Sequence, residues 1–198
     1  HACALLDITP YFVSAPLIEP FAVSGELPRE AVEQQLIDHP DIRAVLVTSP
    51  TYYGVCRALP ALADLCRAFG KPLLVDAAHG AHFPAVGLSA PIADGADMAV
   101  LSMHKTLPCL GQGAVLLSAQ GVDKRALREN TALFGTSSPS YPIMASIDLA
   151  RAYTEGPGRT AYRHAAEACG ELRDFVARRT AFTPLTENDF PALDPCRL

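Results

Sequence analysis

The chain has 198 residues, 49% of them apolar, which is enough for one domain with a substantial core. Its formal net charge of −5 and the lack of a basic stripe argue against nucleic acid or an acidic membrane surface as the main partner. No apolar run approaches the roughly 18 residues needed to cross a bilayer, so we expect no membrane segment.

The first half of the chain has the pattern of an α/β domain. A turn over residues 25–28 precedes a predicted helix over residues 29–37. Continuous short apolar runs then predict buried parallel strands at residues 44–48, 72–76 and 98–102, and a fourth strand at 114–118 follows a glycine-rich turn. A helix over residues 59–69, closed by Gly70, joins the first two strands. Strand, helix and strand within about 30 residues form a βαβ unit, which predicts a sheet covered by helices.

The second half of the chain is predicted to be mainly helical. Helices are expected over residues 123–133, 142–154 and 158–178, the last with an apolar stripe at helical spacing. The tail from residue 183 to residue 198 is rich in proline and is expected to be irregular.

Lys105 is the most informative single residue. Of the sixteen basic residues only three are lysines, and Lys71 and Lys124 lie in an ordinary turn and in a charged helix start. Lys105 instead follows a buried strand, in the run Ser102-Met-His-Lys-Thr106. A lysine amine can lose its proton and form an imine with an aldehyde, which an arginine cannot do. The plain alternative is a surface lysine whose stem packs on apolar neighbours.

An acid and this lysine follow two neighbouring predicted strands. Asp76 ends the second strand, and Lys105 comes just after the third, so in a parallel sheet both arrive at the same crevice. A lysine that carries the cofactor and a carboxylate that keeps a pyridine nitrogen protonated are typical of pyridoxal phosphate sites. Ala78 is small enough for a ring to lie against it, and the hydroxyls and imidazole beside Lys105 suit a phosphate. Alone, Asp76 could equally cap the turn that follows it.

Four segments, in order over residues 40 to 150, resemble the major domain of the ornithine/lysine/arginine decarboxylases, which are fold-type I pyridoxal-phosphate enzymes. The segments are Thr48-Ser-Pro-Thr-Tyr-Tyr-Gly54, Leu74-Val-Asp-Ala-Ala-His-Gly-Ala-His82, Ser102-Met-His-Lys-Thr-Leu-Pro108 with Gln112, and Thr136-Ser-Ser-Pro-Ser-Tyr141 leading to Ala145-Ser-Ile-Asp148. The resemblance implies an α/β fold with a mostly parallel sheet and helices on both faces, truncated at both ends.

The resemblance also implies roles for individual residues. Lys105 would bear the cofactor, Asp76 would pair with its ring nitrogen, and Ala78 would pack on one ring face. The phosphate would be reached by Ser102 and His104, and His1 aligns with a histidine that stacks on the other ring face. We further expect His79 to take part in proton transfer. The family's usual acid is replaced here by Ala77, and the family's upstream Ser/Thr/Gly-rich phosphate loop has no counterpart in these 198 residues.

These observations predict a decarboxylase of ornithine, lysine or arginine with a Lys105 Schiff base, acting in the cytoplasm on a small amino acid as a homodimer or higher homo-oligomer. Residues 1–155 would form part of the cofactor-binding major domain, and residues 156–198 a connecting helix and the start of a C-terminal domain. The alternatives are an aminotransferase- or lyase-like enzyme on the same scaffold, or an inactive remnant that only binds a partner.

Neither a metal site nor a disulfide framework is predicted. Asp76, His79 and His82 have a spacing that a metal could use, but no further nitrogen or thiolate follows at a convincing distance. The six cysteines lie scattered without a Cys-x-x-Cys pair, which indicates reduced thiols that pack as small apolar groups.

Overall fold

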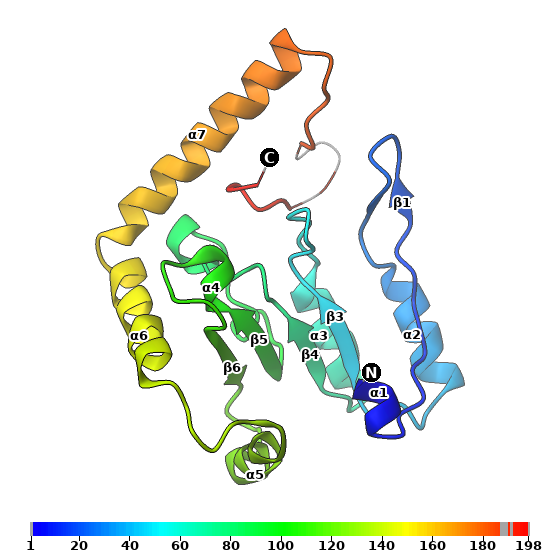
Figure 1. The fold of residues 1–198 in the computed structure, drawn as a ribbon. Helices are drawn as coiled ribbons and strands as arrows, with labels where there is room; N and C mark the ends of the chain where they lie inside the picture. Colours follow the sequence, from blue (N-terminus) through cyan, green and yellow to red (C-terminus); the bar gives the residue numbers. More distant parts are fainter. Residues whose placement is uncertain (1, 187–189, 191, 198) are drawn as a thin grey trace.

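A mixed sheet lies at the centre of the computed structural model, which describes residues 2–186, 190 and 192–197. Its strands follow each other across the sheet in chain order: β3 (Val45–Thr48), β4 (Leu73–Asp76), β5 (Met98–Ser102) and β6 (Ala114–Ser118) (Figure 1). The first three are parallel, and β6 runs antiparallel to β5. All four predicted strands are confirmed. The direction of β6 follows from its short connection, since the helical turn α4 (Met103–Thr106) and a tight turn send the chain straight back along β5.

One face of the sheet packs against helices. Alternate strand residues, including Val47, Val75 and Ala99, share a buried cluster with α3 (Leu59–Ala68) and α2 (Arg29–Asp38). The amphipathic pattern that predicted α3 supplies its buried stripe of Leu59, Leu62, Ala63, Leu65 and Cys66. The helix ends as expected, because Gly70 adopts a positive φ of 64° that a residue with a side chain would rarely take. This packed layer holds the strand ends in register.

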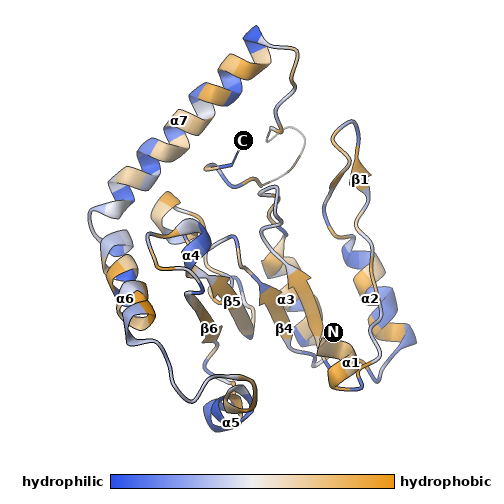
Figure 2. Ribbon diagram, in the orientation of Figure 1, coloured by the Kyte–Doolittle hydropathy of each residue, from blue (hydrophilic) through white to orange (hydrophobic). Residues whose placement is uncertain are grey.

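The opposite face of the sheet is open in the described residues. Leu46, Val100 and Leu116 lie on it and are 70%, 44% and 39% exposed. The strands are therefore apolar on both sides, as Figure 2 shows by their colour, but the described helices cover one side. Asp76 pairs with Val100 across β4 and β5, so its side chain lies on this open face.

The helical half of the chain agrees with the predicted ranges. It comprises α5 (Lys124–Phe134), α6 (Tyr141–Glu155) and α7 (Gly158–Arg179). Asp123 caps α5, because its carboxylate accepts hydrogen bonds from the backbone N–H groups of Arg125 and Ala126. In the part of the chain that the structure describes, no helix combines the length and hydropathy that crossing a membrane requires.

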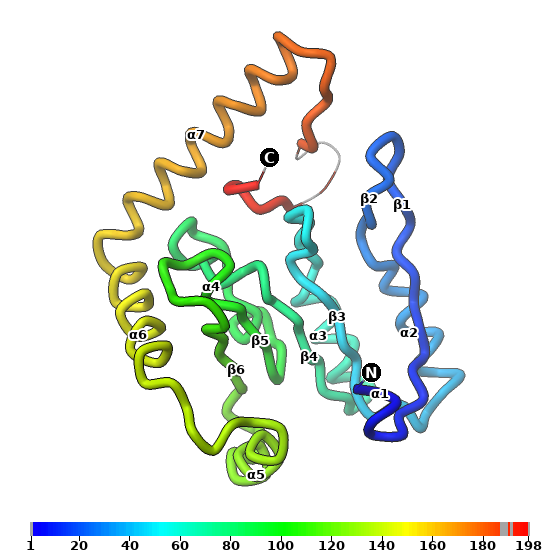
Figure 3. Tube along the Cα trace, viewed as in Figure 1, coloured from blue at the N-terminus to red at the C-terminus, as the bar shows by residue number. Residues whose placement is uncertain are grey.

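Several short elements were not predicted from the sequence. They are α1 (Ala2–Leu5), the 3-10 turn η1 (Phe83–Val86), and a small hairpin of β1 (Leu17–Ile18) and β2 (Val23–Ser24) that projects away from the central sheet (Figure 3). Each has two to four residues, too few to show a hydrophobic period.

The tail after α7 folds back onto the loop that follows β3. Val55 and Leu193 form an isolated β-bridge, the Cys56 N–H donates to Ala192 O, and the Asp194 N–H donates to Gly54 O. Figure 3 shows the two segments meeting near the upper end of the sheet. The tail is irregular, as predicted, but it is also packed. The proposed division at residue 156 coincides with the break between α6 and α7 and stays a prediction.

Candidate active site

Two of the predicted residues end neighbouring parallel strands. Asp76 is the last residue of β4, and Ser102 is the last of β5. Because Asp76 pairs with Val100, and Val100 and Ser102 are two residues apart, both side chains lie on the open face of the sheet. Lys105 follows within α4, the single helical turn that begins directly after β5. The expected convergence at the carboxyl edge of the sheet is therefore present in the arrangement of the strands.

Asp76 is exposed and only partly engaged. One oxygen, Oδ1, accepts a hydrogen bond of 3.0 Å from the backbone N–H of Ala78, which fixes the turn after β4. Asp76 therefore does cap the turn that follows it, which was the alternative role considered for it. This bond leaves Asp76 Oδ2 available. Ala78 is half-buried and presents only a methyl group, while the neighbouring Ala77 is fully buried. An acid in place of Ala77 would need a buried partner, so alanine suits this packed position.

His79 lies within the electrostatic reach of both Lys105 and Asp76. Burial lowers its pKa from the ordinary value of 6.5, and the positive charges of Lys105 and Arg197 lower it further. The negative charge of Asp76 opposes this shift. Lys105 itself is exposed, and within the described residues nothing hydrogen-bonds its amine. The lysine, the acid and the histidine singled out from the sequence therefore influence one another.

Arg197 completes this group and was not predicted. Its Nη2 donates to His79 Nδ1 at 2.9 Å, and its guanidinium carbon lies 5.8 Å from the centre of the Tyr52 ring. Since a guanidinium can only donate, Nδ1 must be the bare nitrogen, and the neutral ring carries its proton on Nε2. Tyr52 also meets the His79 ring edge-on, with ring centres 5.5 Å apart. In the sequence Arg197 stands in a proline-rich tail, where no period or motif marked it.

The two predicted phosphate ligands differ in what they can offer. Ser102 is half-buried at the end of β5. His104 is exposed, and its Nδ1 donates to Gly113 O at 3.0 Å. That bond fixes the ring against the turn before β6 and leaves Nε2 free to face a ligand. His1, predicted to stack on the cofactor, lies outside the described residues.

A cavity of about 250 Å³ adjoins Lys105. Besides Lys105 it is lined by His82, Thr106, Tyr162, Asp194, Cys196 and Arg197. Among the predicted site residues that the structure describes, only Lys105 lines it. The tail therefore supplies walls next to the lysine, on a side that the sequence did not indicate.

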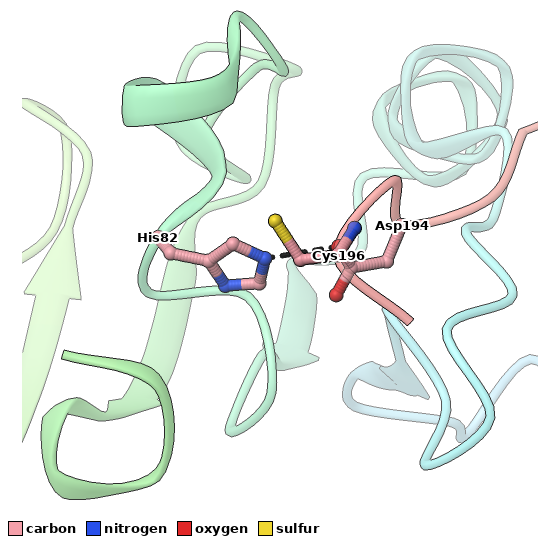
Figure 4. Close-up of side chains that lie close together, drawn as sticks. All are labelled: His82, Asp194 and Cys196. Atoms are coloured by element: carbon pink, nitrogen blue, oxygen red, sulfur yellow. Dashed lines mark hydrogen bonds and ion pairs between the residues drawn. The ribbon is translucent and has the colours of Figure 1, made fainter. Parts of the chain in front are cut away.

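His82, whose spacing from Asp76 and His79 a metal could have used, binds the tail. Its Nε2 lies 2.9 Å from Asp194 Oδ1, and the Cys196 thiol lies near both (Figure 4). The three donor atoms fall within 4.8 Å of one another. Two of them already have partners, because His82 and Asp194 bind each other and Asp194 Oδ1 also accepts from the Cys196 N–H at 2.9 Å. These hydrogen bonds account for the arrangement, because they hold the tail against the loop after β4.

The chain matches the family described as "Orn/Lys/Arg decarboxylase, major domain" over residues 1–195. Among curated proteins, it is 37% identical over 173 residues to an arginine decarboxylase of Halalkalibacterium halodurans, covering 85% of this chain and 35% of that protein. Among solved structures, it resembles a lysine decarboxylase of Francisella novicida, with a TM-score of 0.72 and 18% identity over 96% of this chain and 33% of the other.

The same architecture also occurs in an enzyme of a different reaction class. A pyridoxamine-pyruvate aminotransferase from Mesorhizobium loti matches with a TM-score of 0.60 and 19% identity, covering 86% of this chain and 47% of that one. These structural similarities show the fold and confirm the predicted fold-type I architecture. The chain spans about a third of the length of the curated relatives it matches. Over nearly all of its own length it matches the major-domain model of the Orn/Lys/Arg decarboxylase family, and it therefore belongs to that family.

Proposed function

We propose that this chain forms the cofactor-binding core of a pyridoxal-phosphate-dependent decarboxylase that acts on ornithine, lysine or arginine. The observation that carries the proposal is that Asp76 ends one parallel strand and Lys105 follows the end of its neighbour, and that the charges of both act on the pKa of His79. The names of the curated relatives support decarboxylation of a basic amino acid.

The described residues suit pyridoxal phosphate. Lys105 has an exposed amine for the aldehyde carbon, and Asp76 keeps one carboxylate oxygen for the ring nitrogen. Ala78 would offer a small surface to the ring, and Ser102 and the unengaged Nε2 of His104 would hold the phosphate. When bound, the cofactor supplies an electron sink that stabilises the carbanion formed at the substrate Cα as CO₂ leaves.

The side chains of Asp76, Lys105 and His79 would each have a separate role in the reaction. Asp76 would pair with the ring nitrogen and favour its protonated form, and Lys105 would hold the cofactor through its aldehyde carbon. Arg197 donates to Nδ1, so the neutral His79 ring holds its proton on Nε2. A neutral imidazole is too weak an acid to give up that proton, so His79 would pass a proton toward Cα only after Nδ1 gains one and releases Arg197. The lowered pKa of His79 keeps the ring neutral at neutral pH and makes its protonated form a stronger acid.

Replacement of Lys105 by alanine in the complete protein tests the proposal. Incubation with pyridoxal phosphate, reduction with borohydride and mass spectrometry of the peptides should place a label on Lys105 in the wild type and none in Lys105→Ala. The other two lysines are matched controls, and Lys71→Ala and Lys124→Ala should keep the label. Unchanged labelling and turnover in Lys105→Ala would refute the assignment.

Product analysis separates decarboxylation from its rivals. Evolution of CO₂ together with a diamine or agmatine is expected from ornithine, lysine or arginine. A keto acid product would instead favour an aminotransferase, a reaction named in one structural neighbour. Absence of any label on Lys105 in the wild type would favour an inactive, partner-binding protein.

We further propose that the complete protein is a homodimer or higher homo-oligomer. Large apolar side chains stand exposed on α5 and α6, including Leu133, Phe134, Tyr141 and Leu149. Exposed large apolar side chains of this kind are typical of subunit contacts. Sedimentation of the complete protein measures the state, and a monomer at all concentrations would contradict it.

A further inference from the structure

We propose that Tyr162 is a positioning residue for Lys105, because its hydroxyl holds the backbone of the turn from which the Lys105 amine reaches the cofactor aldehyde. The inference rests on the function proposed above and deepens it. Tyr162 lies on α7, a helix for which the sequence predicted no site residue.

The helical turn α4 is too short to hold its own shape. It has four residues, Met103–Thr106, whereas isolated helices shorter than about 12 residues are marginal in water. The last carbonyls of a helix have no partner within it, and that of Thr106 is one of them. The direction of the backbone at Lys105 therefore depends on contacts that other elements supply.

Two such contacts anchor the residues on either side of Lys105. On one side, the backbone N–H and the Nδ1 of His104 both donate to Gly113 O, at 3.1 and 3.0 Å. On the other side, the Tyr162 hydroxyl donates to Thr106 O at 2.6 Å. The Thr106 hydroxyl is buried without a partner in the described part of the chain, so it adds nothing to this anchor. The backbone of Lys105 is thereby held between two fixed points, while its side chain stays exposed.

Tyr162 is itself fixed before any ligand arrives. Its ring lies against the His82 ring, with centres 6.0 Å apart and planes inclined by 28°, and His82 is held by Asp194. The Tyr162 side chain also packs against the buried core. Burial raises the pKa of Tyr162 above its ordinary value of 10.0, and the neighbouring Tyr153 and Cys196 raise it further. The hydroxyl therefore keeps its proton and remains a donor at neutral pH.

The direction of Lys105 affects the bond that it would form with the cofactor. In that step the neutral amine attacks the aldehyde carbon and gives its two protons to the aldehyde oxygen, which leaves as water. The attack needs the nitrogen about 3 Å from the carbon and correctly oriented, so an ordered backbone leaves fewer rotations to restrict. Tyr162, Thr106 and Lys105 line the same cavity of about 250 Å³, which places the anchor beside the reacting amine.

Two forms of the cofactor test the inference in the complete protein. Pyridoxal phosphate can form the imine with Lys105, whereas pyridoxamine phosphate has the same ring and phosphate but no aldehyde. Equilibrium dialysis of the cofactor-free protein measures both dissociation constants. Tyr162→Phe keeps the ring and loses the hydroxyl. It should weaken binding of pyridoxal phosphate about three- to tenfold, as expected for one lost hydrogen bond, and leave pyridoxamine phosphate unchanged.

Tyr153→Phe is the matched control. It removes a hydroxyl of α6 that has no hydrogen-bond partner among the described residues, so it should change neither affinity. A second comparison uses Lys105→Ala, in which no imine can form. In that background Tyr162→Phe should have no further effect on pyridoxal phosphate, because the two residues act on the same bond.

The remaining outcomes would overturn the inference. Equal weakening of both cofactor forms by Tyr162→Phe would mean that the tyrosine only supports the cavity, and unchanged affinity for both would mean that its hydrogen bond does not matter. A further loss of pyridoxal phosphate affinity on top of Lys105→Ala would show that the hydroxyl contacts the cofactor directly. The proposed function fails separately, if the wild type takes no label on Lys105.

Discussion

His82 Nε2 lies 2.9 Å from Asp194 Oδ1, although 112 positions separate the two residues along the chain. Both side chains are almost fully buried, with 2% and 1% of their surface exposed. Such a pair joins the loop after β4, which carries His79 and begins directly after Asp76, to the tail that carries Arg197. The two halves of the candidate site therefore share one buried connection.

Removal of His82 should destabilise the protein strongly. In His82→Ala the Asp194 carboxylate stays buried without its imidazole partner, and breaking such a pair costs about 3 kcal/mol or more. Urea unfolding at neutral pH measures the change. Arg178→Ala is the control, because its ion pair with Asp174 is exposed and should contribute less than about 1 kcal/mol. A loss in His82→Ala no larger than in the control would show that the pair does not hold the tail.

The lowered pKa of His79 predicts a pH dependence of stability. The folded protein binds this proton less readily than the unfolded chain, whose histidine titrates near 6.5. As the pH falls below that value, protonation therefore favours the unfolded state, and the contribution of His79 to stability is lost through its folded pKa.

His79→Gln isolates this effect. The free energy of unfolding of the wild type should fall between about pH 7 and pH 5, and the variant should show a smaller fall over the same range. His164→Gln, which removes an exposed histidine of α7, should behave as the wild type does. A wild-type slope that His79→Gln leaves unaltered would assign the dependence to other groups.

The sequence predicted the sheet well, because its signals are local. Each strand is a short apolar run, and α3 carries a complete amphipathic stripe followed by Gly70, so element type and order follow from neighbouring residues. The same locality placed Asp76 and Lys105 correctly at strand ends. Because the two strands are parallel neighbours, their carboxyl ends then lie at the same edge of the sheet.

The tail could not be predicted for the opposite reason. Its contacts with Gly54, His79 and His82 join residues more than a hundred positions apart, and no periodicity records such pairings. Arg197 and Asp194 look like ordinary residues of a proline-rich segment until the chain folds back. The open face of the sheet could not be predicted either. A continuous apolar run is expected for a strand whether helices cover one of its sides or both.

Burial predicts that three thiols react slowly. It raises the pKa of Cys56 to about 12 and those of Cys66 and Cys196 to about 11, and nearby carboxylates add to the effect. Because the thiolate is the reactive form, iodoacetamide at neutral pH should modify the exposed Cys3 well before these three. Peptide mass spectrometry over time gives the order. In urea all four should react at similar rates, and labelling of Cys66 as fast as Cys3 in the folded protein would contradict the buried packing of α3.

Substitution of Asp76 can separate the effect of its negative charge from its role in the turn after β4. Asp76→Asn keeps an oxygen to accept the Ala78 N–H, so the turn after β4 should survive, while the negative charge is lost. If the carboxylate keeps the cofactor nitrogen protonated, the decarboxylation rate of the complete protein should fall by about ten- to hundredfold, the worth of one charge-assisted hydrogen bond. Asp64→Asn, on the exposed side of α3, should retain full activity and the same unfolding midpoint. Normal turnover in a well-folded Asp76→Asn would mean that the carboxylate only caps its turn, and the pairing of Asp76 with Lys105 around one cofactor would have to be abandoned.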